Sequence, residues 1–132
     1  MKSHRVRKPP ADNQGWKRQY RQVEKAIQKE YVSWLREHYD IEIIHVPNEG
    51  DVKPQYRKQL IALGMRKGCA DLILIGLRSI VFHEIKSSEG RHDKAQIDFA
   101  SSLEKRGFTY IVTYGLEKAK QVPDKYGFPK RP

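Results

Sequence analysis

Residues Asp71 to Lys86 read DLILIGLRSIVFHEIK and give the strongest indication of the fold. This stretch consists of two apolar, β-branched halves around a short break, which is typical of two strands joined by a tight turn. Because side chains alternate along a strand, Glu84 and Lys86 project from the same face of the second strand. If the strands pair as a hairpin, its open end brings Asp71 close to both. The stretch therefore predicts two carboxylates and an ammonium at one edge of a sheet.

Helices and strands alternate on both sides of this hairpin. Apolar residues at three- and four-residue steps predict amphipathic helices, and short β-branched runs predict strands. The expected elements are a helix 16–38, a strand 41–46, a helix 54–63, strands 71–77 and 80–86, a helix 93–106, a strand 108–113 and a short helix 116–121. This α-β-α-β-β-α-β-α order predicts an α/β fold in which helices flank a small central mixed sheet.

Length and composition exclude several classes of protein. The 132 residues suit one domain, which we place at 16–122 between a basic flexible arm, 1–15, and a basic C-terminal tail, 123–132. No apolar run reaches the ~20 residues of a membrane span, and the N-terminus lacks a secretory signal. The single cysteine excludes a disulfide framework and a multi-cysteine zinc site. We therefore expect a cytoplasmic protein with no membrane partner.

The net charge of +10 is concentrated at the two ends of the chain. Residues 1–21 carry seven bases and one acid, and residues 117–132 carry five bases and two acids. The intervening span is nearly neutral, with fourteen bases and thirteen acids. Basic ends attract a polyanion such as a nucleic acid, although they are also consistent with a solvated surface or solubilising tails.

The carboxylates and the lysine of the hairpin have the chemistry of a metal-dependent hydrolytic site. Carboxylate oxygens with a backbone carbonyl form the hard-oxygen site that Mg²⁺ prefers. A neighbouring lysine can hold the attacking water and neutralise charge on a phosphate, so the set suits metal-assisted hydrolysis of a phosphodiester. The alternative is a salt bridge between Glu84 and Lys86 that only closes the strand end, because E-x-K spacing is common.

Four segments in order resemble the motifs of the VRR-NUC domain (virus-type replication–repair nuclease) of the PD-(D/E)XK nuclease superfamily. They are VEKAIQ with Glu24 and Gln28, the glycine-bounded run from Gly64 to Asp71, the Glu84-Ile85-Lys86 strand, and KAQIDF with Gln96 and Phe99. The resemblance covers about residues 22–114. One departure is Ala70, which stands where the superfamily name has proline.

The resemblance implies a restriction-endonuclease-like fold and a role for each matching residue. Asp71 and Glu84 would bind Mg²⁺ or Mn²⁺ together with the backbone carbonyl of Ile85. Lys86 would be the catalytic lysine. Glu24 would bind or orient the metal through water, and Gln96 would support the site.

Several of these residues also have ordinary structural interpretations. Glu24 could belong to a solvated helix face, and Gln96 could form a helix capping box with Asp93. Basic residues near the motifs could contact phosphates or simply be solvated. The candidate DNA-binding residues are Arg66, Lys67, Arg91 and Lys94.

Together, charge and motifs predict a Mg²⁺- or Mn²⁺-dependent endonuclease that recognises DNA by backbone shape. The resemblance further implies a homodimer that resolves four-way (Holliday) junctions during replication, recombination or repair, since one protomer has one site. It also implies that the protein works in the cytoplasm of a bacterial or phage-infected cell. A flap or single-strand-specific nuclease remains an alternative. So do a non-catalytic DNA-binding module on a nuclease-like fold and a basic RNA-associated protein.

Overall fold

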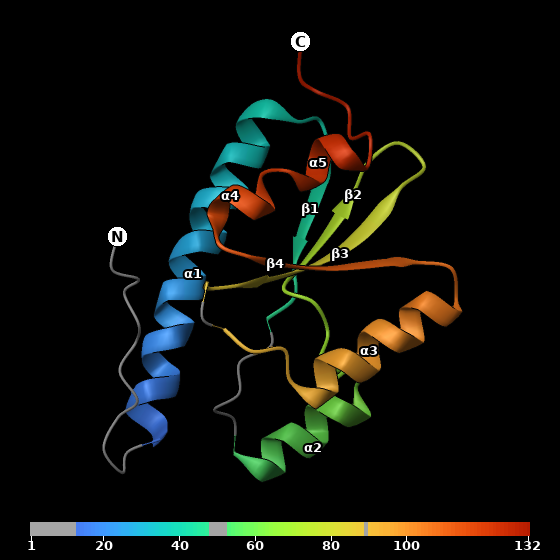
Figure 1. The fold of residues 1–132 in the computed structure, drawn as a ribbon. Coiled ribbons are helices and arrows are strands. Elements are labelled where there is room, and N and C mark those ends of the chain that lie inside the picture. Colours follow the sequence, from blue (N-terminus) through green and yellow to red (C-terminus); the bar gives the residue numbers. More distant parts are fainter. Residues whose placement is uncertain (1–12, 48–52, 89) are drawn as a thin grey trace.

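The computed structural model describes residues 13–47, 53–88 and 90–132, so most of the expected arm 1–15 lies outside it. The elements are α1 (Asn13–His38), β1 (Glu42–His45), α2 (Pro54–Ala62), β2 (Leu72–Ile75), β3 (Ile80–Lys86), α3 (Lys94–Lys105), β4 (Thr109–Tyr114), α4 (Leu116–Ala119) and α5 (Val122–Lys125). The expected α/β order is confirmed, and α5 is an additional short helix (Figure 1). None of the described helices combines the length and apolar composition needed to cross a membrane.

The four strands form one mixed sheet in the order β1-β2-β3-β4. The predicted hairpin is present, because β2 and β3 pair antiparallel with Leu72 opposite His83. Its turn is closed by a 2.9 Å hydrogen bond from the Gly76 N–H to the Ser79 carbonyl. β1 continues the antiparallel arrangement on one side, whereas β4 pairs parallel to β3 on the other after the α3 crossover.

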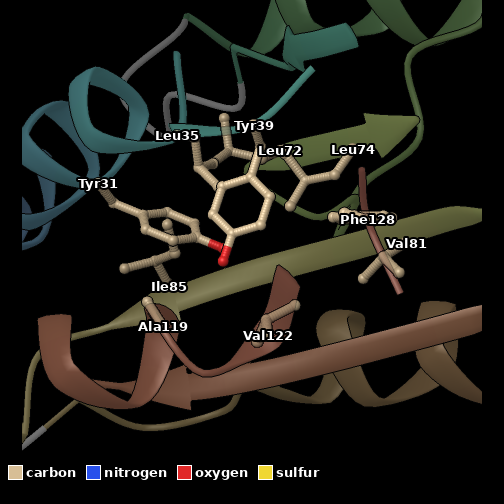
Figure 2. Close-up of a cluster of buried hydrophobic side chains, with 10 residues drawn as sticks. All are labelled: Tyr31, Leu35, Tyr39, Leu72, Leu74, Val81, Ile85, Ala119, Val122 and Phe128. Carbon is tan, nitrogen blue, oxygen red and sulfur yellow. The ribbon is translucent and has the colours of Figure 1, made fainter. Parts of the chain in front are cut away.

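Because side chains alternate along the hairpin, its two faces pack against different helices. Figure 2 shows the larger core, in which Tyr31 and Leu35 of α1 pack on the side chains of Leu72 and Ile85 with almost no exposure. On the opposite face, the rings of Phe82 in β3 and Phe99 in α3 meet edge to face, with centroids 5.9 Å apart. The sheet therefore lies between α1 on one side and α3 on the other.

The C-terminal segment, which we expected to be a tail, packs against the domain. Phe128 is only 4% exposed within the core that also contains Val122 of α5. The Tyr39 hydroxyl donates a 2.7 Å hydrogen bond to Asp124, and Tyr39 forms an isolated β-bridge with Lys130. Single apolar residues separated by turn-forming ones give no periodic signal, so only the packed structure identifies them as core.

Two local features fix the start of α3 beside the hairpin. Asp93 caps the helix in a capping box, as the sequence suggested. Gly68, in the loop before β2, has φ +83° and passes so close to the backbone of α3 that a Cβ there would collide with the Ala95 carbonyl. The second glycine of the glycine-bounded motif thus allows this loop and α3 to touch.

Candidate active site

A cleft of about 860 Å³ opens where the hairpin ends beside α1. The sheet side is lined by Asp71, Glu84 and Lys86, and α3 contributes Gln96. The α1 side is lined by a row of polar and basic side chains: Arg21, Glu24, Lys25, Gln28, Lys29 and Arg36. The five side chains that the sequence proposed as catalytic therefore line one cleft.

The two carboxylates of the hairpin are joined through the backbone. The N–H of Asp71 donates a 3.2 Å hydrogen bond to Oε2 of Glu84, and the N–H of Ile85 donates a 2.9 Å bond to Oδ2 of Asp71. This reciprocal pair holds Asp71, just before β2, against the end of β3. The convergence that strand alternation predicted is thus present in the fold.

Burial makes this pair costly to ionise fully. Desolvation raises the pKa of Glu84 well above its ordinary value, the nearby Asp71 charge raises it further, and Lys86 opposes both. Desolvation also raises the pKa of Asp71, against the lowering effects of its hydrogen bonds and of Lys86. Two adjacent carboxylates with raised pKa values are stabilised in their ionised form by a cation.

Lys86 provides one positive charge at this place. Its Nζ lies 3.7 Å from Oε1 of Glu84, and the side chains of Lys86 and Glu84 are 10% and 4% exposed. The pair is therefore an almost buried ion pair that borders the cleft. The salt bridge between Glu84 and Lys86 that the sequence suggested is present. A second carboxylate, that of Asp71, lies beside it, so the group contains two acids and one base.

Glu24 joins the group from α1, far away in sequence. Its Oε2 accepts a 3.0 Å hydrogen bond from the N–H of Ser87, directly after β3. Burial raises the pKa of Glu24, while this bond and Lys86 lower it. A Cβ on Gly90 would lie 2.7 Å from Oε2 of Glu24, so the loop backbone also closes over this carboxylate. Glu24 is thus held at the site and does not belong to a freely solvated helix face.

Gln96 fulfils both roles that the sequence left open. Its Oε1 accepts a 3.0 Å hydrogen bond from the Asp93 N–H, completing the capping box. Its Nε2 donates a 2.8 Å bond to Oε1 of Glu84. One amide therefore caps α3 and fixes the orientation of a candidate metal ligand.

His45 is a cleft residue that the sequence pattern did not single out. Its Nδ1 lies 3.0 Å from Nε2 of Gln28 and 3.1 Å from the carbonyl oxygen of Asp71. The pairing of β1 with β2 places His45 opposite Leu72, next to Asp71. The signal was available only through that strand pairing, because His45 has no ligand spacing in sequence.

The basic residues at the cleft differ from those expected. Arg66, Lys67, Arg91 and Lys94 are exposed, and none of them lines the cleft. Arg66 places its guanidinium 5.5 Å from the centroid of the Phe99 ring. Apart from Lys86 of β3, the Lys and Arg residues that line the cleft lie on α1, where spacing near multiples of a helical turn is the sequence signal that could have found them: Arg21, Lys25, Lys29 and Arg36.

The donor atoms suit a divalent cation of the magnesium type. In the described part of the chain, no three His, Cys, Asp or Glu side chains are grouped closely enough to form an all-side-chain metal site. Mg²⁺, however, is commonly bound by one or two carboxylates and keeps several waters. Asp71 and Glu84 offer those carboxylates. The N–H and C=O of a strand residue point to the same side, so the Ile85 carbonyl shares the strand edge that faces Asp71.

Two solved structures share this fold. One, described as a "VRR_NUC domain protein", has a TM-score of 0.67 and 21% sequence identity, covering 78% of this chain and 86% of its own. Another, described as a "VRR_NUC domain", has a TM-score of 0.57 and 19% identity, covering 78% and 96%. The sequence matches no protein-family model and no curated protein. The chain therefore has the fold of VRR_NUC domains, as the motif resemblance predicted.

Proposed function

We propose that this protein is a divalent-metal-dependent endonuclease that hydrolyses phosphodiester bonds in DNA. The observation that carries the proposal is the convergence of Asp71, Glu84 and Lys86 in an open cleft with a basic wall. The VRR_NUC fold supports it, because the names of both similar structures refer to a nuclease domain. A non-catalytic DNA-binding module would not need this costly arrangement of buried charges.

In this mechanism Asp71, Glu84 and the Ile85 carbonyl would hold Mg²⁺ or Mn²⁺, which when bound would supply Lewis-acid stabilisation of charge on the phosphate. Lys86 donates hydrogen bonds from its ammonium to a phosphate oxygen and to the attacking water. Attack by the water oxygen would form the new P–O bond while the ester P–O bond breaks. The water would lose one proton to solvent and the leaving oxygen would take up one, leaving one phosphate end and one hydroxyl end.

Gln96 and Glu24 support the site by positioning other groups. Gln96 keeps Glu84 turned toward the cleft through its 2.8 Å hydrogen bond. Glu24, anchored by the N–H of Ser87, adds a carboxylate at the edge of the site that can order water beside the cation. Such supporting contacts are worth about 10- to 100-fold in metal affinity or activity.

We further propose that the substrate is branched DNA, with a four-way junction as the first candidate, and that the active form is a homodimer. The motif resemblance supports this choice. The described part of one chain holds one such group of candidate catalytic residues, whereas paired cuts in two strands of a junction need two active sites. A flap or single-strand substrate is the alternative within the same chemistry.

The test is cleavage of a panel of end-labelled DNAs: a four-way junction, a flap, a linear duplex and a single strand. We expect nicking with Mg²⁺ or Mn²⁺ and none with EDTA. Asp71→Asn retains an acceptor for the Ile85 N–H but removes the charge, and should abolish nicking. Lys86→Ala should do the same. Lys105→Ala, an exposed change on α3, is the matched control and should cut normally.

The outcomes separate the parts of the proposal. Equal cleavage by wild-type protein and Asp71→Asn would overturn the assignment of the site. Cleavage confined to flaps or single strands would overturn the junction preference while leaving the nuclease intact. Light scattering of the active protein measures its mass, and an active monomer would contradict the homodimer.

A further inference from the structure

The wall of the cleft formed by α1 has a strongly one-sided charge. Arg21, Lys25, Lys29 and Arg36, which we call the α1 basic stripe, all line the same cleft as the carboxylates. At about 100° per residue, these four positions fall within about 80° of one another around the helix. The four cations therefore share one face of α1, with Val32 between Lys29 and Arg36.

The acids of α1 are segregated from this surface. Glu30 and Glu37 are exposed, and their positions lie roughly 120–140° from the centre of the stripe. Glu24 is turned toward the end of β3, where it accepts the hydrogen bond from Ser87. No acid of α1 thus interrupts the stripe, and charge of this kind attracts a polyanion and not a mixed-charge protein surface.

The stripe has a direction relative to the site. Arg36 lies twelve residues after Glu24, which corresponds to roughly 18 Å along the helix axis, whereas Arg21 lies only about 4.5 Å before it. At ~3.4 Å per base pair, 18 Å corresponds to about five base pairs of duplex. The stripe therefore extends from the carboxylates mainly to one side.

We infer that the α1 basic stripe binds the phosphate backbone of the duplex flanking the scissile bond, on one side of the cut. This inference rests on the proposed function for the identity of the polyanion. It assigns substrate positioning to the stripe and not to Arg66, Lys67, Arg91 and Lys94, which do not line the cleft. Backbone contacts of this kind orient a duplex without reading its sequence.

The test measures DNA binding without cleavage. A labelled duplex is titrated in EDTA, by fluorescence anisotropy, over a range of NaCl concentrations. In the stripe variant Lys25→Gln/Lys29→Gln/Arg36→Gln, the slope of log affinity against log salt should become shallower by about 0.9 for each phosphate that the protein no longer neutralises. The control Lys58→Gln/Lys105→Gln/Lys118→Gln removes the same charge from exposed positions on α2, α3 and α4. It should leave the slope within about 0.5 of wild type, which is less than the effect of one phosphate.

Flank length provides a second measurement. Substrates trimmed to two base pairs on one side of the cut should lose affinity only when the trimmed side is the one that reaches the stripe. Equal slopes for the stripe and control variants, or equal loss of affinity on trimming either side, would overturn the inference. Stripe-dependent binding by a wild-type protein that cuts no DNA would contradict the proposed nuclease and not the stripe.

Discussion

His83 and Glu84 are neighbours in β3 and point to opposite faces of the sheet. Both are buried, at 0% and 3% exposure. His83 lies in the α1 core, where its Nε2 is 2.7 Å from the Thr113 hydroxyl and its ring meets the edge of Tyr31 with centroids 5.2 Å apart. Glu84 instead meets Asp71, Gln96 and Lys86 at the cleft.

Equal burial has different chemical results on the two faces. Around His83 burial lowers the pKa to about 3, so the ring is neutral and acts as a core residue. Burial and the Asp71 carboxylate raise the pKa of Glu84, and the neighbouring Lys86 lowers it. Glu84 therefore belongs to a group of charged side chains that borders the cleft. A buried polar side chain thus indicates a functional site only when its neighbours can compensate its charge and solvent can reach it.

The largest expected effect distinguishes the two faces by activity. Glu84→Gln keeps the side-chain shape but removes one carboxylate, so Mn²⁺ affinity and cleavage should fall at least about 100-fold. The melting temperature of the metal-free protein should stay close to that of wild type, because relief of the repulsion with Asp71 offsets loss of the ion pair with Lys86. Calorimetric Mn²⁺ titration, single-turnover cleavage and a melt in EDTA measure these three quantities.

The matched control for this prediction is His83→Gln, on the other face. It should lower the melting temperature by disturbing the bond to Thr113, yet leave cleavage by the folded protein close to that of wild type. Equal loss of cleavage in both variants, measured well below both melting temperatures, would show that the two faces of β3 are not separate.

Gln96 both caps α3 and contacts Glu84, so we expect an intermediate effect from its replacement. Gln96→Ala should lower the unfolding free energy by about 1 kcal/mol through removal of its part of the cap and slow cleavage about 10- to 100-fold. Asp93→Ala removes the capping carboxylate and leaves the backbone N–H that donates to Gln96. It should therefore cost similar stability in urea unfolding while cleavage stays near wild type. Loss of cleavage in the Asp93 variant would contradict this division.

The smallest expected effect is a pair of opposing pH dependences of stability, measured as melting temperature in EDTA. Folding raises the pKa of Glu84 above its ordinary value of 4.5. This carboxyl therefore contributes stability in full below pH 4.5 and loses that contribution as the pH rises. A histidine whose pKa is lowered stabilises above 6.5 and loses that contribution as the pH falls toward 3, which applies to His83. The fall in melting temperature toward alkaline pH and the fall toward acid pH, which we call the two limbs of the pH profile, should each amount to several degrees.

Variants assign the two limbs. Glu84→Gln should weaken the alkaline fall in melting temperature, and His83→Phe should weaken the acid fall. Adding Mg²⁺ should also weaken the alkaline fall in wild type, because the cation stabilises both ionised carboxylates. An unchanged pH profile in either variant would rule out that residue as the origin of its limb.

Local sequence was sufficient to predict the hairpin and the pairing of its charges. Alternation places Glu84 and Lys86 on one face, and a two-strand turn brings Asp71 to them, whatever packs outside. The capping box of Asp93 and Gln96 is likewise a local pattern, spanning four residues. The element order and its α/β layers could therefore be read from the sequence, with strand and helix ends correct to within a few residues.

Contacts between distant segments were decided only by the tertiary structure. Glu24 reaches the N–H of Ser87 across 63 positions of sequence, and Phe128 enters the core although its segment reads as a basic tail. The α1 basic stripe faces the site because the apolar residues of that helix pack on the sheet and fix its rotation. Short-range patterns determine which side chains share a strand or helix face, whereas the packing of α1, α3 and the C-terminal segment determines which faces meet.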